Sequence, residues 1–293
     1  MATTRVGLIG VGIMGAPMGR NLMRAGFALS VTTRTRSRAE ELLSLGATWS
    51  ESPADVARTS DVVISMVGDS PDVELVYLGP RGVQEGVTHD TICVDMSTVS
   101  PETARTVAVA LRERGAHFLD APVSGGKTGA EAGTLSIMAG GDAAVLERVR
   151  PVLSAMGKSI VHCGPVGNGQ LTKLCNQILC GLNLLAVSEA MVFARRVGLD
   201  PQIMLQAVSK GAAGSWALDN LGSRMLTRDF KPMFMIDLQQ KDLRIALQAA
   251  RESATPLPGT GLVHQLLAAN QAMGEGREGT QALVKTLERL AGM

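Results

Sequence analysis

Aromatic residues are scarce in this sequence: Phe, Trp and Tyr together make up 3% of its 293 residues. Single-stranded nucleic acids bind proteins largely by stacking their bases on such rings, so this scarcity argues against a nucleic-acid surface. The formal net charge of +1 also gives no electrostatic footprint for a polyanion. We therefore expect no nucleic-acid partner.

Cysteine and histidine are scarce as well, with four of each, and neither type is clustered. The cysteines contain no C-x-x-C pair, which favours reduced thiols over a disulfide framework or a zinc site. The histidines have no ligand spacing, so we expect no metal. No secretory signal is visible, and no uninterrupted apolar run approaches the ~20 residues of a membrane span. These absences predict a cytoplasmic protein with no membrane partner.

The first half of the chain alternates short apolar runs with helical segments. We expect buried strands over residues 5–9, 29–33, 62–66, 91–95, 117–120, 135–139 and 159–163. Between two of them, Ser100 is a good N-cap, Pro101 suits the first position of a helix, and Gly115 ends it. Such alternation predicts a mostly parallel sheet that is covered by helices on both faces.

The second half has a different pattern, with helical spacing and no strand signal. We expect helices over residues 170–197, 201–210, 215–226, 238–253, 261–273 and 280–290. The predicted fold is therefore an N-terminal Rossmann-type, doubly wound α/β domain over residues 1–163. An all-α substrate and oligomerisation domain over residues 164–293 follows, and it begins with a long interdomain helix.

A glycine-rich turn follows the first expected strand and leads into a helix. Gly10 permits the tight turn, Gly12 lets the backbone approach a pyrophosphate, and Gly15 allows close packing of helix and strand. The intervening Ile13 and Met14 would lie beside the same ligand. Free N–H groups at the helix N-terminus favour phosphate there. A turn without a ligand is the alternative, but the strand–turn–helix–strand context favours a dinucleotide site.

The segment after the second strand, "VTTRTRSR", indicates which dinucleotide binds. An NAD site usually has an acidic residue there for the ribose hydroxyls, and this stretch has none before Glu40. Arg34 suits a 2′-phosphate instead, and Thr33 and Thr35 offer hydroxyls. We expect NADP(H) to be preferred, with NAD(H) as the alternative. A solvated basic turn would explain the same residues without a ligand.

Two later segments carry candidate chemistry. In "DAPVSGG", the backbone of Gly125 and Gly126 and the hydroxyl of Ser124 can form a concavity for a carboxylate, although a loop can also need glycine only for its dihedral angles. In "GNGQLTKLCNQ", Lys173 and Asn176 project from one otherwise apolar helix face. A lysine is costly there unless it is exposed, paired or functional, and an exposed surface lysine is the alternative.

Taken together, these segments resemble the β-hydroxyacid dehydrogenase family. "GLIGVGIMGAPM", "DAPVSGG", "GNGQLTKLCNQ" and "KDL" occur in the family's order and spacing along the whole chain. The family includes tartronate semialdehyde reductases, 3-hydroxyisobutyrate dehydrogenases and glyoxylate/succinic semialdehyde reductases. "AGSWALDN" and "RDFKPMFMIDLQQKDL" are most similar to the tartronate semialdehyde reductase (2-hydroxy-3-oxopropionate reductase) branch.

The resemblance implies roles for particular residues. Lys173 would be the proton donor, and Asn176 would orient the substrate and the lysine. The remaining roles are substrate carboxylate binding by Ser124, Gly125 and Gly126, nicotinamide ribose contacts from Val67, Gly68 and Thr98, and closure over cofactor and substrate by Lys241. A homodimer or homotetramer is also implied.

The implied reaction is NADPH-dependent reduction of a small semialdehyde carboxylate to the hydroxy acid. Its main alternative is an NAD-dependent 3-hydroxyisobutyrate-type dehydrogenase that works in the oxidative direction. An imine reductase, a related type that generally lacks the lysine, and a non-catalytic nucleotide-binding module are disfavoured because Lys173 is present.

Overall fold

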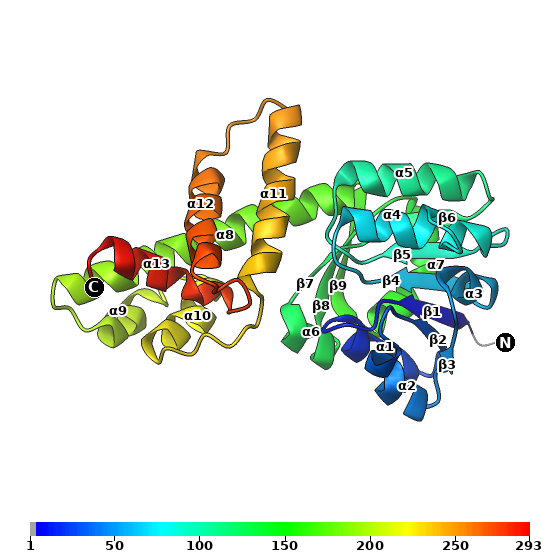
Figure 1. The fold of residues 1–293 in the computed structure, drawn as a ribbon, viewed down its shortest axis with the longest axis horizontal. Coiled ribbons are helices and arrows are strands. Elements are labelled where there is room, and N and C mark those ends of the chain that lie inside the picture. Colours follow the sequence, from blue (N-terminus) through cyan, green and yellow to red (C-terminus); the bar gives the residue numbers. More distant parts are fainter. Residues whose placement is uncertain (1–3) are drawn as a thin grey trace. The chain divides into compact units, whose positions relative to one another are not determined.

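The computed structural model describes residues 4–293, so positions 1–3 of the expected first domain lie outside the described residues. The chain forms two compact units, coloured blue to green and green to red in Figure 1. The first unit ends at Lys173, and the second unit is Leu174–Met293. Each unit has a hydrophobic core of its own.

In the part of the chain that the structure describes, the first unit contains a nine-stranded sheet of order β3-β2-β1-β4-β5-β6-β8-β7, with β9 paired to β8. The strands are β1 (Arg5–Ile9), β2 (Ala28–Thr32), β3 (Thr48–Trp49), β4 (Val62–Ser65), β5 (Ile92–Asp95), β6 (His117–Asp120), β7 (Val123–Ser124), β8 (Leu135–Gly140) and β9 (Gly157–Gly164). All the expected strands form. The sequence did not predict β3 and β7, because two-residue strands are too short to show a period.

The sheet is parallel from β3 to β6, while β8 runs antiparallel to β6 and β7. Successive residues of a strand belong to different hydrophobic clusters. Leu8 and Ile64 belong to one cluster, and their neighbours Ile9 and Val63 belong to another. Alternate side chains of a strand point to opposite faces, so both faces of the sheet are covered. The predicted doubly wound sheet is confirmed.

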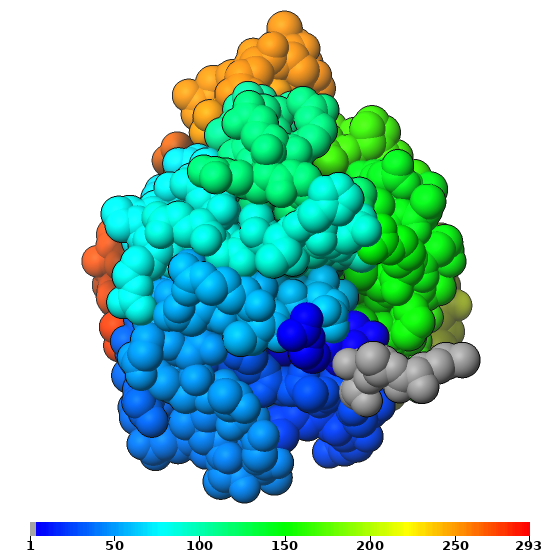
Figure 2. Space-filling model, turned by 90° about the vertical axis from the view of Figure 1, so that its right-hand side faces the viewer, coloured from blue at the N-terminus to red at the C-terminus, as the bar shows by residue number. Residues whose placement is uncertain are grey.

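Helices of the first unit follow most of these strands. They are α1 (Gly15–Arg24), η1 (Arg36–Ala39), α2 (Glu40–Ser44), α3 (Pro53–Arg58), α4 (Ser70–Leu78), η2 (Val83–Glu85), α5 (Pro101–Arg112), α6 (Gly126–Ala132) and α7 (Ala143–Ser154). At α5, Ser100 accepts a hydrogen bond from the Thr103 amide, and Gly115 adopts φ 75° just beyond the helix, as the sequence predicted. On the face shown in Figure 2, blue, cyan and green segments pack side by side.

The long helix α8 (Asn168–Arg196) begins in the first unit and continues into the second. We expected the domain change at Gly164, but the compact units divide later, after Lys173. The reason is that the Asp120 carboxylate accepts hydrogen bonds from the amides of Gly167 and Gln170, which bind the start of α8 to the sheet. By length and composition α8 could cross a membrane, with a mean hydropathy of 1.6 over 18 residues, and 50% of that window is buried within the protein.

The second unit is helical, as predicted. It contains most of α8, followed by α9 (Pro201–Val208), α10 (Trp216–Leu226), α11 (Ile236–Glu252), α12 (Pro258–Ala272), η3 (Thr280–Ala282) and α13 (Leu283–Leu290). Its described residues contain no strand beyond the isolated bridge between Met235 and Gly279. Its core gathers buried side chains from α8, α10, α11, α12 and α13, among them Met191, Leu221, Leu243, Val263 and Leu283.

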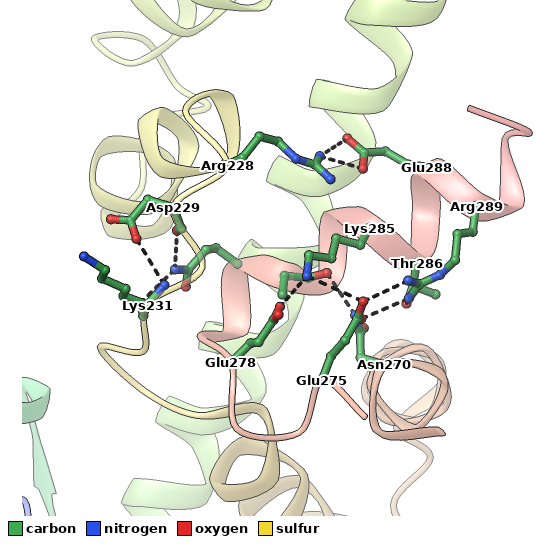
Figure 3. A network of polar contacts seen from close by, with 12 residues as sticks. Arg228, Asp229, Lys231, Asn270, Glu275, Glu278, Lys285, Thr286, Glu288 and Arg289 are labelled. Carbon is green, nitrogen blue, oxygen red and sulfur yellow. Dashed lines mark hydrogen bonds and ion pairs between the residues drawn. The ribbon is translucent and has the colours of Figure 1, made fainter. Parts of the chain in front are cut away.

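A polar network ties the end of the chain to the rest of the second unit (Figure 3). Lys285 of α13 lies 2.6 Å from Glu278 and 3.5 Å from Glu275, and its ammonium sits over the Phe230 ring. Glu288 is paired with both Arg195 of α8 and Arg228. These partly buried pairs fix the orientation of α13 where its apolar face meets the core.

Candidate active site

The turn between β1 and α1 contains three glycines, and the surroundings of each glycine differ. Gly10 has φ 98°, and a Cβ there would lie 2.3 Å from the Met66 carbonyl oxygen. A Cβ on Gly15 would lie 1.9 Å from the Gly10 carbonyl oxygen, so helix and turn pack too closely for a side chain. A Cβ on Gly12 would meet no atom within 4 Å. The fold therefore requires Gly10 and Gly15 but not Gly12, and a bare backbone at Gly12 fits a pyrophosphate that approaches it closely.

The parallel strands place the other predicted cofactor residues at the same edge of the sheet. Because β1, β2, β4, β5 and β6 run in one direction, their carboxyl ends meet. The predicted residues that follow these ends are Gly10, Gly12, Ile13, Met14 and Gly15 after β1, Thr33, Arg34 and Thr35 after β2, Val67 and Gly68 after β4, and Thr98 after β5. Hydrogen bonds join these turns to the ends of neighbouring strands: the Gly10 amide donates to the Thr32 carbonyl, and the Met96 amide donates to the Ser65 carbonyl.

Arg34 projects from the turn after β2 with 86% of its side chain exposed. Its Nη1 lies 3.3 Å from Oδ1 of Asp72 in the first turn of α4. The other Asp72 oxygen accepts a hydrogen bond from the Asp69 amide and so helps to cap α4. The sequence missed this acid because it follows a different strand. The turn itself contains no carboxylate, and the guanidinium of Arg34 is solvent-accessible.

A buried carboxylate joins the turns after β4 and β5. Asp95 is fully buried, and its Oδ1 accepts hydrogen bonds of 2.7 Å from the hydroxyls of Ser65 and Ser97. The Val67 amide in turn donates to the Ser97 hydroxyl at 2.9 Å. Burial raises the pKa of Asp95 to about 6. This network sets the backbone at Val67 and Thr98, the two turns expected beside the nicotinamide ribose.

The segment "DAPVSGG" turns sharply after β6. Val123 and Ser124 form β7 and pair with β8, with Ser124 opposite Ser136. Gly125 and Gly126 adopt φ values of 130° and 58°, which residues with a Cβ rarely adopt. The backbone therefore accounts for both glycines, and binding of a carboxylate by residues 124–126 stays a prediction.

Asp120 fixes the start of α8 and with it Lys173. Its Oδ1 accepts the Gly167 amide at 2.7 Å, and its Oδ2 accepts the Gln170 amide at 2.8 Å. A carboxylate at a helix N-terminus is favourable because it faces free amides and the positive end of the helix dipole. Burial raises the pKa of Asp120 to about 6, although these backbone bonds oppose the shift.

Gln170 makes a second attachment between α8 and the strand ends. Its side chain donates to the Ser97 carbonyl at 2.8 Å and accepts from the Val99 amide at 3.1 Å, so it flanks Thr98 on both sides. Lys173 follows one turn later and is only 6% exposed. The alternative of a surface lysine is therefore wrong. The first unit therefore holds Lys173 on a helical turn that is hydrogen-bonded to the ends of strands followed by predicted nucleotide-binding residues.

Asn176 and Lys241, the remaining predicted site residues, belong to the second unit. The Asn176 amide donates to Gln177 Oε1 at 2.7 Å, and the Lys241 ammonium lies 2.9 Å from Asp242 Oδ1. Lys173 and Asn176 are three residues apart in α8, as expected. Sequence reasoning missed the supporting residues Asp95, Asp120 and Gln170. An acid as the last residue of each of two buried strands, in "TICVD" and "HFLD", was the available signal for the two aspartates.

Two family models together cover this chain. Residues 5–164 match the NAD-binding domain of 6-phosphogluconate dehydrogenase, and residues 167–287 match the NAD-binding domain of NADP-dependent 3-hydroxyisobutyrate dehydrogenase. The chain is 46% identical over 287 residues to the 2-hydroxy-3-oxopropionate reductase of Escherichia coli (strain K12), covering 98% of both chains. The chain belongs to the β-hydroxyacid dehydrogenase family. The resemblance seen in its motifs is thereby confirmed.

Other members of this family are similarly close. The NAD-dependent L-serine dehydrogenase of Pseudomonas aeruginosa is 40% identical over 261 residues, covering 87% of this chain and 88% of that one. The solved structure of Mycobacterium tuberculosis 3-hydroxyisobutyrate dehydrogenase with L-serine has a TM-score of 0.90 at 32% identity, covering 98% of this chain and 99% of that one. This β-hydroxyacid dehydrogenase is an NAD(P)-dependent oxidoreductase that acts on hydroxyacids.

Proposed function

We propose that this β-hydroxyacid dehydrogenase uses NADPH to reduce a small semialdehyde carboxylate to the hydroxy acid, with Lys173 as the proton donor. The substrate class is tartronate semialdehyde, glyoxylate or succinic semialdehyde. The observation that carries the proposal is the placement of Lys173, which is buried on a turn that Asp120 and Gln170 bond to the ends of β5 and β6. The 46% identity to a 2-hydroxy-3-oxopropionate reductase supports the substrate class.

The chain's own residues would bind and orient the reactants. The amides around Gly12 would hold the pyrophosphate of the cofactor, which supplies the hydride when bound. Ser124 and the amides of Gly125 and Gly126 would hold the substrate carboxylate.

Lys173 would stabilise and then protonate the developing alkoxide. As hydride reaches the aldehyde carbon, the C=O π electrons move to oxygen, and the Lys173 ammonium donates a hydrogen bond to that oxygen. The proton then passes from Nζ to oxygen and leaves a neutral amine, which solvent reprotonates. Asn176 would orient the substrate and the lysine.

The preference for NADPH rests on the turn after β2. Arg34 is exposed and carries a guanidinium that can bind a 2′-phosphate through two N–H groups. The turn lacks the acid that would bind the ribose hydroxyls of NAD. Thr33 and Thr35 would add hydroxyl contacts to the same phosphate.

The second candidate is an NAD-dependent 3-hydroxyisobutyrate-type dehydrogenase that oxidises its substrate. The observation that favours it is the 40% identity to an NAD-dependent L-serine dehydrogenase. In that direction the neutral amine of Lys173 would accept the hydroxyl proton.

A substrate panel separates the two functions. Tartronate semialdehyde, succinic semialdehyde, methylmalonate semialdehyde and glyoxylate should be assayed with NADPH and with NADH. 3-Hydroxyisobutyrate and L-serine should be assayed with NADP⁺ and NAD⁺. We expect the highest kcat/KM for a semialdehyde acid with NADPH. A higher kcat/KM for a hydroxy acid with NAD⁺ would replace the first candidate with the second.

We also propose that the protein is a homodimer or homotetramer. Leu179 and Phe193 of α8 are 63% and 66% exposed, and with exposed Ala186 they form an apolar stripe at intervals of seven residues. Exposed apolar stripes of this kind mark association surfaces. Light scattering after size exclusion should give a multiple of the 30.7 kDa chain mass. Phe193→Ser should shift that mass toward the monomer, and a monomeric wild type would disprove the proposal.

A further inference from the structure

A continuous set of polar contacts links Asn176 to Lys241 inside the second unit. The Asn176 amide donates to Gln177 Oε1 at 2.7 Å. Gln177 Nε2 donates to Asp242 Oδ2 at 2.5 Å, and Asp242 Oδ1 lies 2.9 Å from the Lys241 ammonium. The family resemblance gives roles to the two ends of this set, since Asn176 would orient the substrate and the lysine and Lys241 would close the site. The two middle residues, Gln177 and Asp242, have no assigned role.

Gln177 has both ends of its side-chain amide engaged. Its oxygen accepts from Asn176, and its nitrogen donates to Asp242 and, at 3.4 Å, to Gln239. The ionised carboxylate of Asp242 only accepts hydrogen bonds, so the Gln177 nitrogen must face it and the oxygen must face Asn176. The charge on Asp242 thereby sets which atom of Gln177 the Asn176 amide meets.

Asp242 is only 2% exposed, and so is Gln239. A carboxylate removed from water in this way is unfavourable unless it is paired. Its Oδ2 accepts a hydrogen bond from Gln177, whereas its Oδ1 makes no hydrogen bond and is paired with the Lys241 ammonium by charge alone. A helix-packing role alone would not need the charge, because apolar residues of similar volume usually stabilise a core at least as well.

We propose that Asp242 and Gln177 are positioning residues of the active site. Asp242 orients the Lys241 ammonium through one oxygen, and through the other it fixes Gln177, which in turn fixes the Asn176 amide. One buried carboxylate therefore sets both site residues of the second unit. This inference rests on the proposed roles of Asn176 and Lys241.

The test is a double-mutant cycle on the full-length enzyme. Asp242→Asn keeps an acceptor for Gln177 but removes the charge facing Lys241, and Gln177→Met removes the partner of Asn176. Each substitution is also made together with a substitution of the residue that it is proposed to position. The two double mutants are Asp242→Asn with Lys241→Met, and Gln177→Met with Asn176→Ala. Asp237→Asn is the matched control, since it changes a carboxylate of the same helix that accepts from Gln271 and is exposed.

We expect Asp242→Asn to lower kcat/KM by about 10-fold in the wild-type background and by less than about 2-fold when Lys241 is already Met. The same pattern should hold for Gln177→Met with Asn176→Ala, and Asp237→Asn should leave kcat/KM unchanged. Equal losses in both backgrounds, accompanied by a lower Tm, would show a structural role and overturn the inference.

Failure of the inference is distinguishable from failure of the proposed function. The cycle is measured with whichever semialdehyde or hydroxy acid the substrate panel identifies, in either direction. If Lys241→Met and Asn176→Ala each leave kcat/KM unchanged, the site assignment is wrong and the inference falls with it. If both lower kcat/KM but the cycles are additive, only the inference is wrong.

Discussion

Asp95 and Asp120 lie directly opposite each other at the carboxyl ends of the neighbouring parallel strands β5 and β6, and both are fully buried. Asp95 holds the turns expected beside the cofactor, and Asp120 holds the start of the helix that carries Lys173. Their proximity raises the pKa of Asp95 further, because ionising one carboxylate disfavours ionising the other. From adjacent positions, one acid therefore supports the turns expected to bind the cofactor, and the other supports the helix that carries the proposed proton donor.

Stability should depend on pH through Asp95. Its pKa is about 6 in the folded protein against an ordinary 3.8. The folded state therefore binds more protons between these values, and the stabilising contribution of Asp95 is lost as pH rises from about 4 to about 6. Asp95→Asn does not ionise there, so its stability relative to wild type should rise over this window, on the order of 2 kcal/mol. Urea unfolding at pH 4.5 and pH 7 measures this, and a pH-independent difference would contradict it.

Replacing Asp120 by Asn should lower both stability and turnover. The variant loses a charge-assisted cap of α8, which costs about 1 kcal/mol or more. Because Lys173 follows this turn, we expect kcat at pH 7.5 to fall while the Kd for NADPH stays unchanged. Asp142→Asn is the control, since Asp142 caps α7 through the amides of Ala144 and Val145. An equal loss of kcat in the control would remove the specific role of Asp120.

The glycines of the first turn should respond differently to alanine. Gly15→Ala should strongly destabilise the protein, because its Cβ would lie 1.9 Å from a backbone oxygen. Gly12→Ala should keep the wild-type Tm, because its Cβ meets no atom within 4 Å. It should nevertheless weaken NADPH binding by about 10-fold or more, since the methyl group occupies the approach of the pyrophosphate. Thermal unfolding and calorimetric titration test both outcomes, and unchanged affinity in Gly12→Ala would place the cofactor elsewhere.

Arg34 and Asp72 should have opposite effects on cofactor choice. Arg34→Ala should weaken NADPH binding by about 10-fold and leave NADH binding nearly unchanged, because only NADPH carries the 2′-phosphate. Asp72→Asn removes an anion that pairs with Arg34 and should strengthen NADPH binding by roughly 2-fold to 5-fold, the scale of an exposed ion pair. Fluorescence titration with both cofactors measures this. Equal losses for NADPH and NADH in Arg34→Ala would show that the phosphate is held elsewhere.

Lys173→Ala should lose at least ~100-fold in kcat, the usual contribution of a general acid, and keep the affinity for NADPH. Lys158→Ala, a change at an exposed lysine of β9, should leave kcat unchanged. Steady-state kinetics with the preferred substrate and a direct cofactor titration separate the two effects. Wild-type turnover in Lys173→Ala would remove this residue from the mechanism.

The sequence by itself determined the features that depend on near neighbours. Apolar runs and helical spacing predicted the main strands, the helical second unit and the cap of α5 at Ser100, because these follow from local periodicity and local hydrogen bonds. The requirement for glycine at position 15 also lies within a single turn, because a Cβ there would meet the Gly10 carbonyl oxygen, and Gly10 itself adopts φ 98°.

Only the tertiary structure decided the contacts that join distant segments. Asp120 bonds to amides 47 and 50 residues away, and Gln177 bonds to Asp242 across 65 residues. No local pattern encodes these pairs, since each depends on which strand ends and helices the fold brings together. For the same reason the burial of Lys173 and the pairing of Arg34 with Asp72 followed from the packing of the chain and not from its order.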